Sequence, residues 1–174
     1  ERSNRAFRTD GVSGGIFYFN LNENYGVPPG RKNTSEATDE DFPPPGERPP
    51  WASVAFDVQS GGNQDLLGYI GGRPRHTDKT HAYVSGENVE KQLVTIWDNP
   101  VPDVYAITWE CREKANPRNV YAGGKAEAKL GAGERQFDAF SFVVPNVKAK
   151  TDAEIRARWV NADGKTMAED VFAI

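Results

Sequence analysis

Alternating hydrophobic and polar positions are clearest in residues 103–111. Two faces alternate along this segment, with Tyr105, Ile107, Trp109 and Cys111 on one and Val104, Ala106, Thr108 and Glu110 on the other. A period of two with β-branched and aromatic residues is typical of a strand whose bulkier face is buried. We therefore predict that this segment forms a central strand of the fold.

Similar patterns recur along the chain and predict further strands. They lie at residues 16–21, 51–58, 66–70, 81–84, 91–98, 120–121, 125–130, 137–144, 153–160 and 167–174. Residues 16–21 are apolar on both faces, which is typical of a strand buried on both sides or lying at an interface. The lysines of residues 125–130 indicate an exposed edge strand. The turn at 161–164 indicates a closing β-hairpin with Gly164 at a position that needs positive φ.

This spacing of short strands predicts an all-β fold, a β-sandwich or jelly roll of about eight to ten mostly antiparallel strands. The 17 glycines and 12 prolines agree with many turns and little helix. Residues 22–50 have no periodicity and are rich in proline, which predicts one long loop. We expect an N-terminal arm at residues 1–13 and a single sandwich domain at residues 14–174.

Charge and composition narrow the classes of partner. The formal net charge is −4, which disfavours nucleic acid and anionic membrane surfaces. No run of 18 apolar residues is present, so we expect no membrane insertion. The single cysteine, Cys111, cannot form an internal disulfide and is expected to be a buried, inert thiol. A first residue of Glu1 suggests a removed leader or a piece of a longer chain, which points weakly to an extracellular or surface-exposed protein.

The sequence contains none of the common catalytic motifs that we looked for. Neither a Gly-x-Ser-x-Gly elbow, a His-Glu-x-x-His pair, a P-loop nor a dinucleotide-binding glycine motif occurs in the sequence. Only two histidines, His76 and His81, are available for acid–base chemistry. The sequence leans away from an enzyme without excluding one.

Three groups of residues are candidates for metal binding. His76, Asp78 and His81 contain the two imidazoles and one carboxylate of a facial metal site, although a polar loop with exposed histidines is the better explanation of them. A calcium site is conceivable among acidic residues, either at Glu36, Asp39, Glu40 and Asp41 or at Asp98, Asn99 and Asp103. Turns favour Asp and Asn for backbone reasons alone. We therefore expect no resident cofactor, with calcium as the open possibility.

A basic loop stands out in this acidic chain. Arg73, Arg75, His76 and Lys79 follow the predicted strand at residues 66–70. Guanidinium groups suit carboxylate, sulfate and phosphate groups, so this loop is a candidate for recognising an acidic sugar or an acidic protein partner. The alternative is a solvated surface loop.

Trp51 is the candidate for stacking on a sugar ring. It follows Pro49 and Pro50 and is predicted to share a strand face with Ser53 and Asp57, which favours exposure of its indole. Most tryptophans in strands belong to the core, and that alternative applies here as well.

Three functional hypotheses from different classes follow. The first is a non-catalytic binding or surface-interaction module that recognises carbohydrate or a protein partner through long loops on a rigid sandwich. The second is a structural subunit of an assembly such as a capsid, fibre or spike, in which residues 16–21 and the arginine-bearing arm contact other subunits as a homo-oligomer. An enzyme with an unrecognised site is the third.

Overall fold

The structure is a computed structural model in which the chain divides into two compact units, residues 1–64 and 65–174. The residues that it describes are 9, 26–32, 36, 38–44, 47–54, 57, 64–73, 75–76 and 80–174. Among these residues, no helix has both the length and the apolar character needed to cross a membrane. The single-domain prediction for residues 14–174 stays a prediction.

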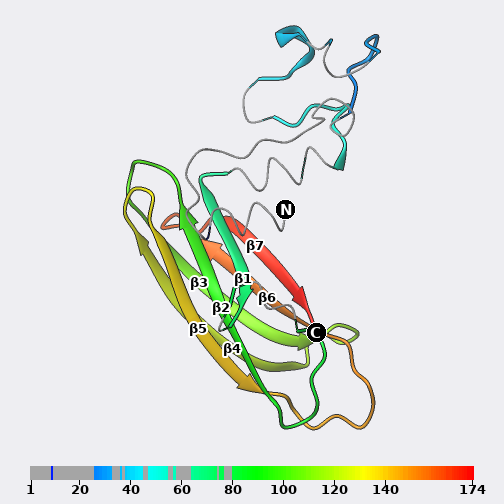
Figure 1. Cartoon of the computed structure of the whole chain (residues 1–174), viewed down its shortest axis with the longest axis vertical. Coiled ribbons are helices and arrows are strands. Elements are labelled where there is room, and N and C mark those ends of the chain that lie inside the picture. Colours follow the sequence, from blue (N-terminus) through cyan, green and yellow to red (C-terminus); the bar gives the residue numbers. More distant parts are fainter. Residues whose placement is uncertain are drawn as a thin grey trace. The chain divides into compact units, whose positions relative to one another are not determined.

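Seven antiparallel strands form two sheets in the described part of the second unit (Figure 1). They are β1 (Leu66–Gly72), β2 (Asn88–Trp97), β3 (Asp103–Glu113), β4 (Val120–Leu130), β5 (Arg135–Val143), β6 (Ala153–Val160) and β7 (Thr166–Ala173). One sheet has the order β1-β2-β5 and the other the order β4-β3-β6-β7. The all-β sandwich prediction is confirmed, with seven strands among the described residues rather than eight to ten.

The central position of β3 is also confirmed. This strand pairs with β4 on one side and β6 on the other, and β4 is an edge strand as its lysines indicated. Tyr105 and Ile107 are fully buried, whereas Val104 on the opposite face is exposed. Trp109 is half-buried, with its ring centroid 4.1 Å from that of Phe140. Alternation therefore identified both the strand and its buried face.

Two predicted strands are absent, and a third lies outside the described residues. The 51–58 prediction is wrong, because the amide of Ala52 donates to the Pro49 carbonyl at 3.0 Å in a turn. Val54 and Asp57 have helical backbone, and the Asp57 amide donates to the Ser53 carbonyl at 3.3 Å. The residues 81–84 are irregular rather than extended in a sheet. Residues 16–21 fall outside the described part of the chain.

The long proline-rich loop is built from turns in its described parts. Its regular element there is the short 3-10 helix η2 (Asp39–Asp41). The Arg31 amide donates to the Pro28 carbonyl at 3.1 Å, and the Glu47 amide donates to the Pro44 carbonyl at 3.1 Å. Proline fixes φ near the value that such turns need, so these local bonds are the expected outcome of the composition.

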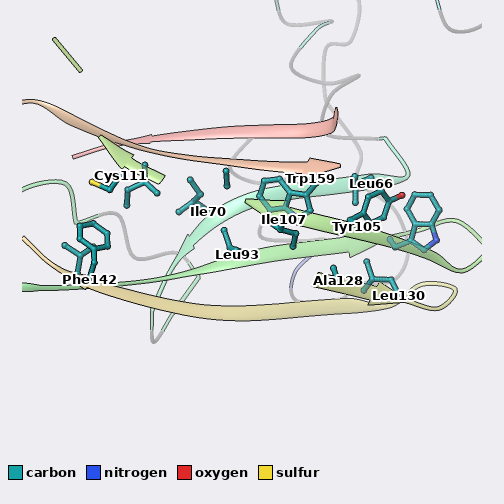
Figure 2. Packing of buried hydrophobic residues seen from close by; sticks show 14 of the residues in the cluster. Leu66, Ile70, Leu93, Tyr105, Ile107, Cys111, Ala128, Leu130, Phe142 and Trp159 are labelled. Carbon is teal, nitrogen blue, oxygen red and sulfur yellow. The ribbon is translucent and has the colours of Figure 1, made fainter. Parts of the chain in front are cut away.

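The hydrophobic core fills the space between the two sheets. Figure 2 shows it extending from Cys111 and Phe142 at one end to Tyr105 and Leu130 at the other. Trp159 of β6 lies between these ends, and its Nε1 donates to Thr95 Oγ1 of β2 at 2.8 Å. A second buried cluster uses the opposite face of the three-stranded sheet and consists of Leu67, Tyr69, Val94 and Ile96.

Side chains close three of the sheet edges. The side-chain amide of Gln136 accepts a hydrogen bond from the backbone N–H of Lys129 at 3.1 Å and donates one to the backbone carbonyl of Glu127 at 2.8 Å, both on β4. Asp170 accepts from the amide of Ile70 in β1 at 2.8 Å. His81 Nδ1 lies 2.7 Å from the carbonyl oxygen of Ala173 in β7. Each contact satisfies a backbone group that an edge strand leaves without a strand partner.

The hairpin of β6 and β7 forms as predicted, with Gly164 at φ 78° in its turn. Its outer face carries a ladder of ion pairs that continues onto β3. The pairs are Arg112–Glu154, Arg112–Glu110, Arg156–Glu154, Arg156–Glu169 and Arg158–Glu169. A hydrogen bond from Arg156 is the main cause that lowers the pKa of Glu154. Because Arg112, Arg156, Glu154 and Glu169 each have two partners, the pairs form a network, and networks stabilise a surface more than isolated ion pairs do.

The two faces of β3 should respond differently to truncation. We expect Ile107→Ala to lower the free energy of unfolding by about 2–5 kcal/mol, because it leaves a cavity in the core. Val104→Ala removes methyl groups from an exposed face and should change it by about 0.5 kcal/mol or less. Urea unfolding of both variants measures the difference. Equal, small losses would mean that β3 is not central.

Candidate functional site

The basic loop after β1 presents two exposed arginines, Arg73 and Arg75. Within the part of the chain that the structure describes, neither guanidinium group has an ion pair. His76 is half-buried, and its carbonyl accepts from the amide of Gly72 at 3.1 Å. Lys79 lies outside the described residues. The loop's role as a recognition site therefore stays a prediction carried by its two arginines.

The proposed His76, Asp78 and His81 metal site is not assembled by the described residues. Asp78 lies outside them, and no group of three or more metal-ligating side chains occurs among the residues described. His81 has a structural contact instead, since its ring stacks on Phe172 with centroids 4.6 Å apart and 4° between planes. With Nδ1 against the Ala173 carbonyl, this stacking fixes the orientation of the imidazole.

The acidic candidates hold their own loops together. Asp41 accepts from the Thr38 amide at 2.8 Å and pairs with Arg31 at 2.9 Å. The Thr38 hydrogen bond is the main cause that lowers the pKa of Asp41. The side chain of Asp39 lies outside the described part. A calcium ion at Asp41 would have to compete with a neighbouring arginine.

The second acidic group lies at the turn before β3. Asn99 donates to Asp65 Oδ2 at 2.7 Å and accepts from the Val101 amide at 2.9 Å. Asp103 accepts from the Tyr105 hydroxyl at 2.6 Å and from the Val104 amide at 2.8 Å. These contacts are the turn chemistry that Asp and Asn commonly supply.

Trp51 is half-buried rather than displayed as an open platform. Its Nε1 donates to the Asp41 carbonyl at 3.0 Å, and Phe42 packs edge-on against it with centroids 5.2 Å apart. Both the polar and the apolar parts of the indole are engaged within the proline-rich loop. The structure therefore favours an anchoring role for Trp51 over sugar stacking.

The strongest candidate site is a pocket of about 530 Å³ at one end of the sandwich, here called the end pocket. Its walls come from the ends of β3, β5 and β7, the starts of β4 and β6, and the segments 81–83 and 144–152. The lining residues are His81, Ala82, Tyr83, Cys111, Lys114, Tyr121, Phe142, Val144, Pro145, Val147, Lys150, Thr151, Asp152, Ala153, Ala173 and Ile174. A pocket of this size is in the range that small ligands occupy.

The inner part of the end pocket is apolar. Cys111 and Phe142 mark this end of the core in Figure 2, and both line the pocket together with Ala153. Pairing of Cys111 with Ile155 across β3 and β6 places the end of β3 beside the start of β6. The end pocket is thus an opening into the space between the two sheets.

Aromatic contacts support the wall of the end pocket that His81 and Tyr83 line. His81 stacks on Phe172, and the buried ammonium of Lys91 lies 4.6 Å from the Phe172 ring centroid and 5.8 Å from that of Tyr83. Cation–π contacts offset part of the cost of burying a lysine. The Tyr83 hydroxyl donates to the Thr80 carbonyl at 2.9 Å, which also fixes this ring. The wall is therefore preformed.

The mouth of the end pocket is charged. Lys114, Lys150 and Asp152 are exposed there, and the Lys114 amide donates to the Asp152 carbonyl at 2.9 Å. The Tyr121 hydroxyl donates to Glu113 at 3.4 Å, and burial is the main cause that raises the pKa of Tyr121. An apolar interior with a few polar groups at its mouth is the usual composition of a ligand site.

Sequence reasoning missed the end pocket as a site. It identified Cys111 as buried and the 137–144 strand as apolar on one face, and both contribute to the interior. No local motif marks the pocket, because its lining comes from seven segments of the chain. The strand ends meet only through the pairing of the folded sheets.

Comparisons with known proteins assign no family to this chain. No family model matches the sequence. No curated protein matches it either. The similar solved structures include a Pseudomonas fluorescens alkylpurine DNA glycosylase bound to DNA with an abasic site analog, at 12% identity and a TM-score of 0.40 over 68% of this chain and 33% of that chain.

Two other similar structures are a CARDB domain and a glycosidase. The CARDB domain of a Pyrococcus furiosus protein, in complex with di-metal ions, matches at 11% identity and a TM-score of 0.42 over 63% of this chain and 90% of that chain. A Bacteroides cellulosilyticus glycosyl hydrolase family 2 member matches at 15% identity and a TM-score of 0.41 over 55% of this chain and 14% of that chain. The chain spans a third or less of the glycosylase and of the glycosidase.

The thiol of Cys111 should be nearly unreactive in the folded protein. Burial raises its pKa from 9.0 to about 11, so at pH 8 its thiolate fraction is roughly a hundredfold lower than when unfolded. We expect alkylation by iodoacetamide to be slower by at least that factor in native protein than in urea. The protonated thiol favours the folded state fully below pH 9, and this contribution disappears as pH rises towards 11. Equal rates in both states would contradict the burial of Cys111.

Proposed function

We propose that this chain is a non-catalytic binding module whose ligand occupies the end pocket. The observation that carries the proposal is the preformed pocket of about 530 Å³, with its apolar interior and charged mouth. Rigid strands supply the interior and two loop segments supply the mouth, which is how binding sites are commonly built on a sandwich.

The reactive groups of the end pocket support binding rather than catalysis. Cys111 has a raised pKa, so its nucleophilic thiolate is scarce near neutral pH. The His81 ring is stacked on Phe172 and bonded through Nδ1 to a backbone carbonyl. The thiol and the imidazole of the end pocket are therefore both engaged in packing.

A second candidate surface is the Arg73 and Arg75 loop, as a contact for an acidic sugar. Both arginines are exposed, and they concentrate positive charge in a chain whose net charge is −4, which favours this surface as a second candidate. Long-range attraction to an anionic partner would act through these groups and would weaken with salt. Recognition of a carbohydrate or protein partner, and a surface or extracellular location, belong to this proposal.

Blocking the end pocket should abolish binding there. Two probe sets test it, namely indole-3-acetate, indole-3-acetamide and tryptamine, and the corresponding phenylacetate, phenylacetamide and phenethylamine. We expect at least one probe to shift the amide NMR signals of Cys111, Ala153 and Ile174. Ala82→Trp, at an exposed position in the mouth, should remove these shifts.

Ala162→Trp is the matched control, because Ala162 is exposed in the turn after β6, whereas the start of that strand lines the pocket. It should leave the shifts unchanged. If no probe of either set shifts the lining residues, the end pocket is not a ligand site and the proposed function fails.

The arginine loop has a separate test. We expect Arg73→Ala with Arg75→Ala to weaken binding to oligogalacturonate at least tenfold, while the melting temperature stays within about 2 °C, because exposed substitutions change stability little. Lys125→Ala with Lys165→Ala removes the same charge elsewhere and should have a much smaller effect. Isothermal titration at two salt concentrations measures both. Equal losses in the two double variants would indicate general electrostatics rather than a site.

A further inference from the structure

We infer that the end pocket selects a small amphipathic carboxylate, with an aromatic or aliphatic body held inside and the carboxylate at Lys114 and Lys150. This inference rests on the proposed function and names the ligand class of the same site. It follows from three features of the pocket: its apolar interior, the charges at its mouth and its volume.

The interior demands an apolar body. Cys111, Phe142 and Ala153 are buried at 1%, 9% and 8% exposure, yet all three line the pocket. Val144 and Ile174, both half-buried, extend the apolar lining towards the mouth. A polar body placed there would lose hydrogen bonds to water without replacing them, which costs free energy. A ring or short alkyl chain is favoured by the burial of its surface.

The mouth demands a negative charge. Lys114 and Lys150 contribute two positive charges and Asp152 one negative charge, so these three residues sum to +1 in a chain of net charge −4. Neither lysine side chain has an ion pair among the residues that the structure describes. Their ammonium groups are therefore available to a ligand anion. Two ammonium groups at one mouth favour an anionic group such as a carboxylate.

Lysine rather than arginine suits this placement. An ammonium group is a compact charge on a flexible stem, and it pairs with a carboxylate without requiring the planar, two-point geometry of a guanidinium. The backbone bond between Lys114 and Asp152 holds the end of β3 beside the segment before β6. The mouth is thereby positioned relative to the apolar interior.

The volume sets the size of the ligand. About 530 Å³ greatly exceeds what acetate or a bare inorganic anion fills. An anion alone would leave the apolar interior in contact with water. The combination of interior and mouth thus selects a carboxylate that carries a body of roughly ten or more non-hydrogen atoms.

Isosteric pairs test the inference directly. We expect indole-3-acetate to bind wild-type protein at least tenfold more tightly than indole-3-acetamide, and tryptamine to bind most weakly, when followed by NMR titration of the Cys111, Ala153 and Ile174 amides. The acid and the amide share one shape, so their difference in affinity reports the charge. This difference should fall as salt rises, because the charges lie at an exposed mouth.

Matched lysine variants locate the charge. In Lys114→Gln with Lys150→Gln, the preference for the acid over the amide should fall to about twofold or less, while affinity for the amide is retained. Lys125→Gln with Lys165→Gln has the same net charge and should keep the tenfold preference. Because all four lysines are exposed, melting temperatures should be unchanged in both double variants.

A third probe tests whether the carboxylate can be the C-terminus of a peptide as well as that of a small molecule. Gly-Gly-Phe with a free carboxyl terminus is compared with its C-terminal amide, and a preference for the free acid adds protein C-termini to the ligand class. Equal binding of indole-3-acetate and indole-3-acetamide to the wild type overturns the inference and leaves the proposed function intact. So does an acid preference that survives in Lys114→Gln with Lys150→Gln. Absence of all binding overturns the inference and the proposed function together.

Discussion

The contact of Trp159 with the facing sheet is the constraint on which the sandwich depends. Its indole donates to Thr95 in the buried interior, and its ring lies where a Cβ on Gly68 would come within 2.5 Å. A buried indole without an acceptor costs about 1–3 kcal/mol, so the hydrogen bond fixes how the ring enters the core. The missing side chain at Gly68 provides the space. Together these residues set the spacing and register of the two sheets at the centre of the core.

Much of this architecture could be predicted from local pattern. The alternation of β3, the lysine-rich edge of β4 and the Gly164 hairpin depend on neighbouring residues, so sequence alone revealed them. The alternation at residues 51–58 wrongly predicted a strand. Pro49 and Pro50 lead into a turn, and the backbone hydrogen bond from Asp57 to Ser53 is helical, which is incompatible with an extended backbone there. A short pattern is a weak guide where local hydrogen bonds oppose it.

The candidate site was less predictable for a physical reason. The end pocket is lined by the termini of strands that are far apart in the sequence. Cys111 and Ile174, for example, line the same pocket because β3 pairs with β6 and β6 pairs with β7. Asp41 and His81 were candidate metal ligands because they can titrate, yet both make hydrogen bonds to nearby backbone groups. The lysines at the mouth carry no motif. Their significance depends on the apolar space behind them.

The closed edges have a consequence for how this protein meets others. Gln136, Asp170 and His81 occupy backbone groups on β4, β1 and β7 that an added strand would need. A foreign strand would have to displace these bonds before it could join the sheet. Copies of the sandwich crowded side by side, as in a tandem array or on a dense surface, are therefore discouraged from merging into a continuous sheet through β1, β4 or β7. The fourth edge strand of the described sheets, β5, is left as the edge at which a further strand can pair.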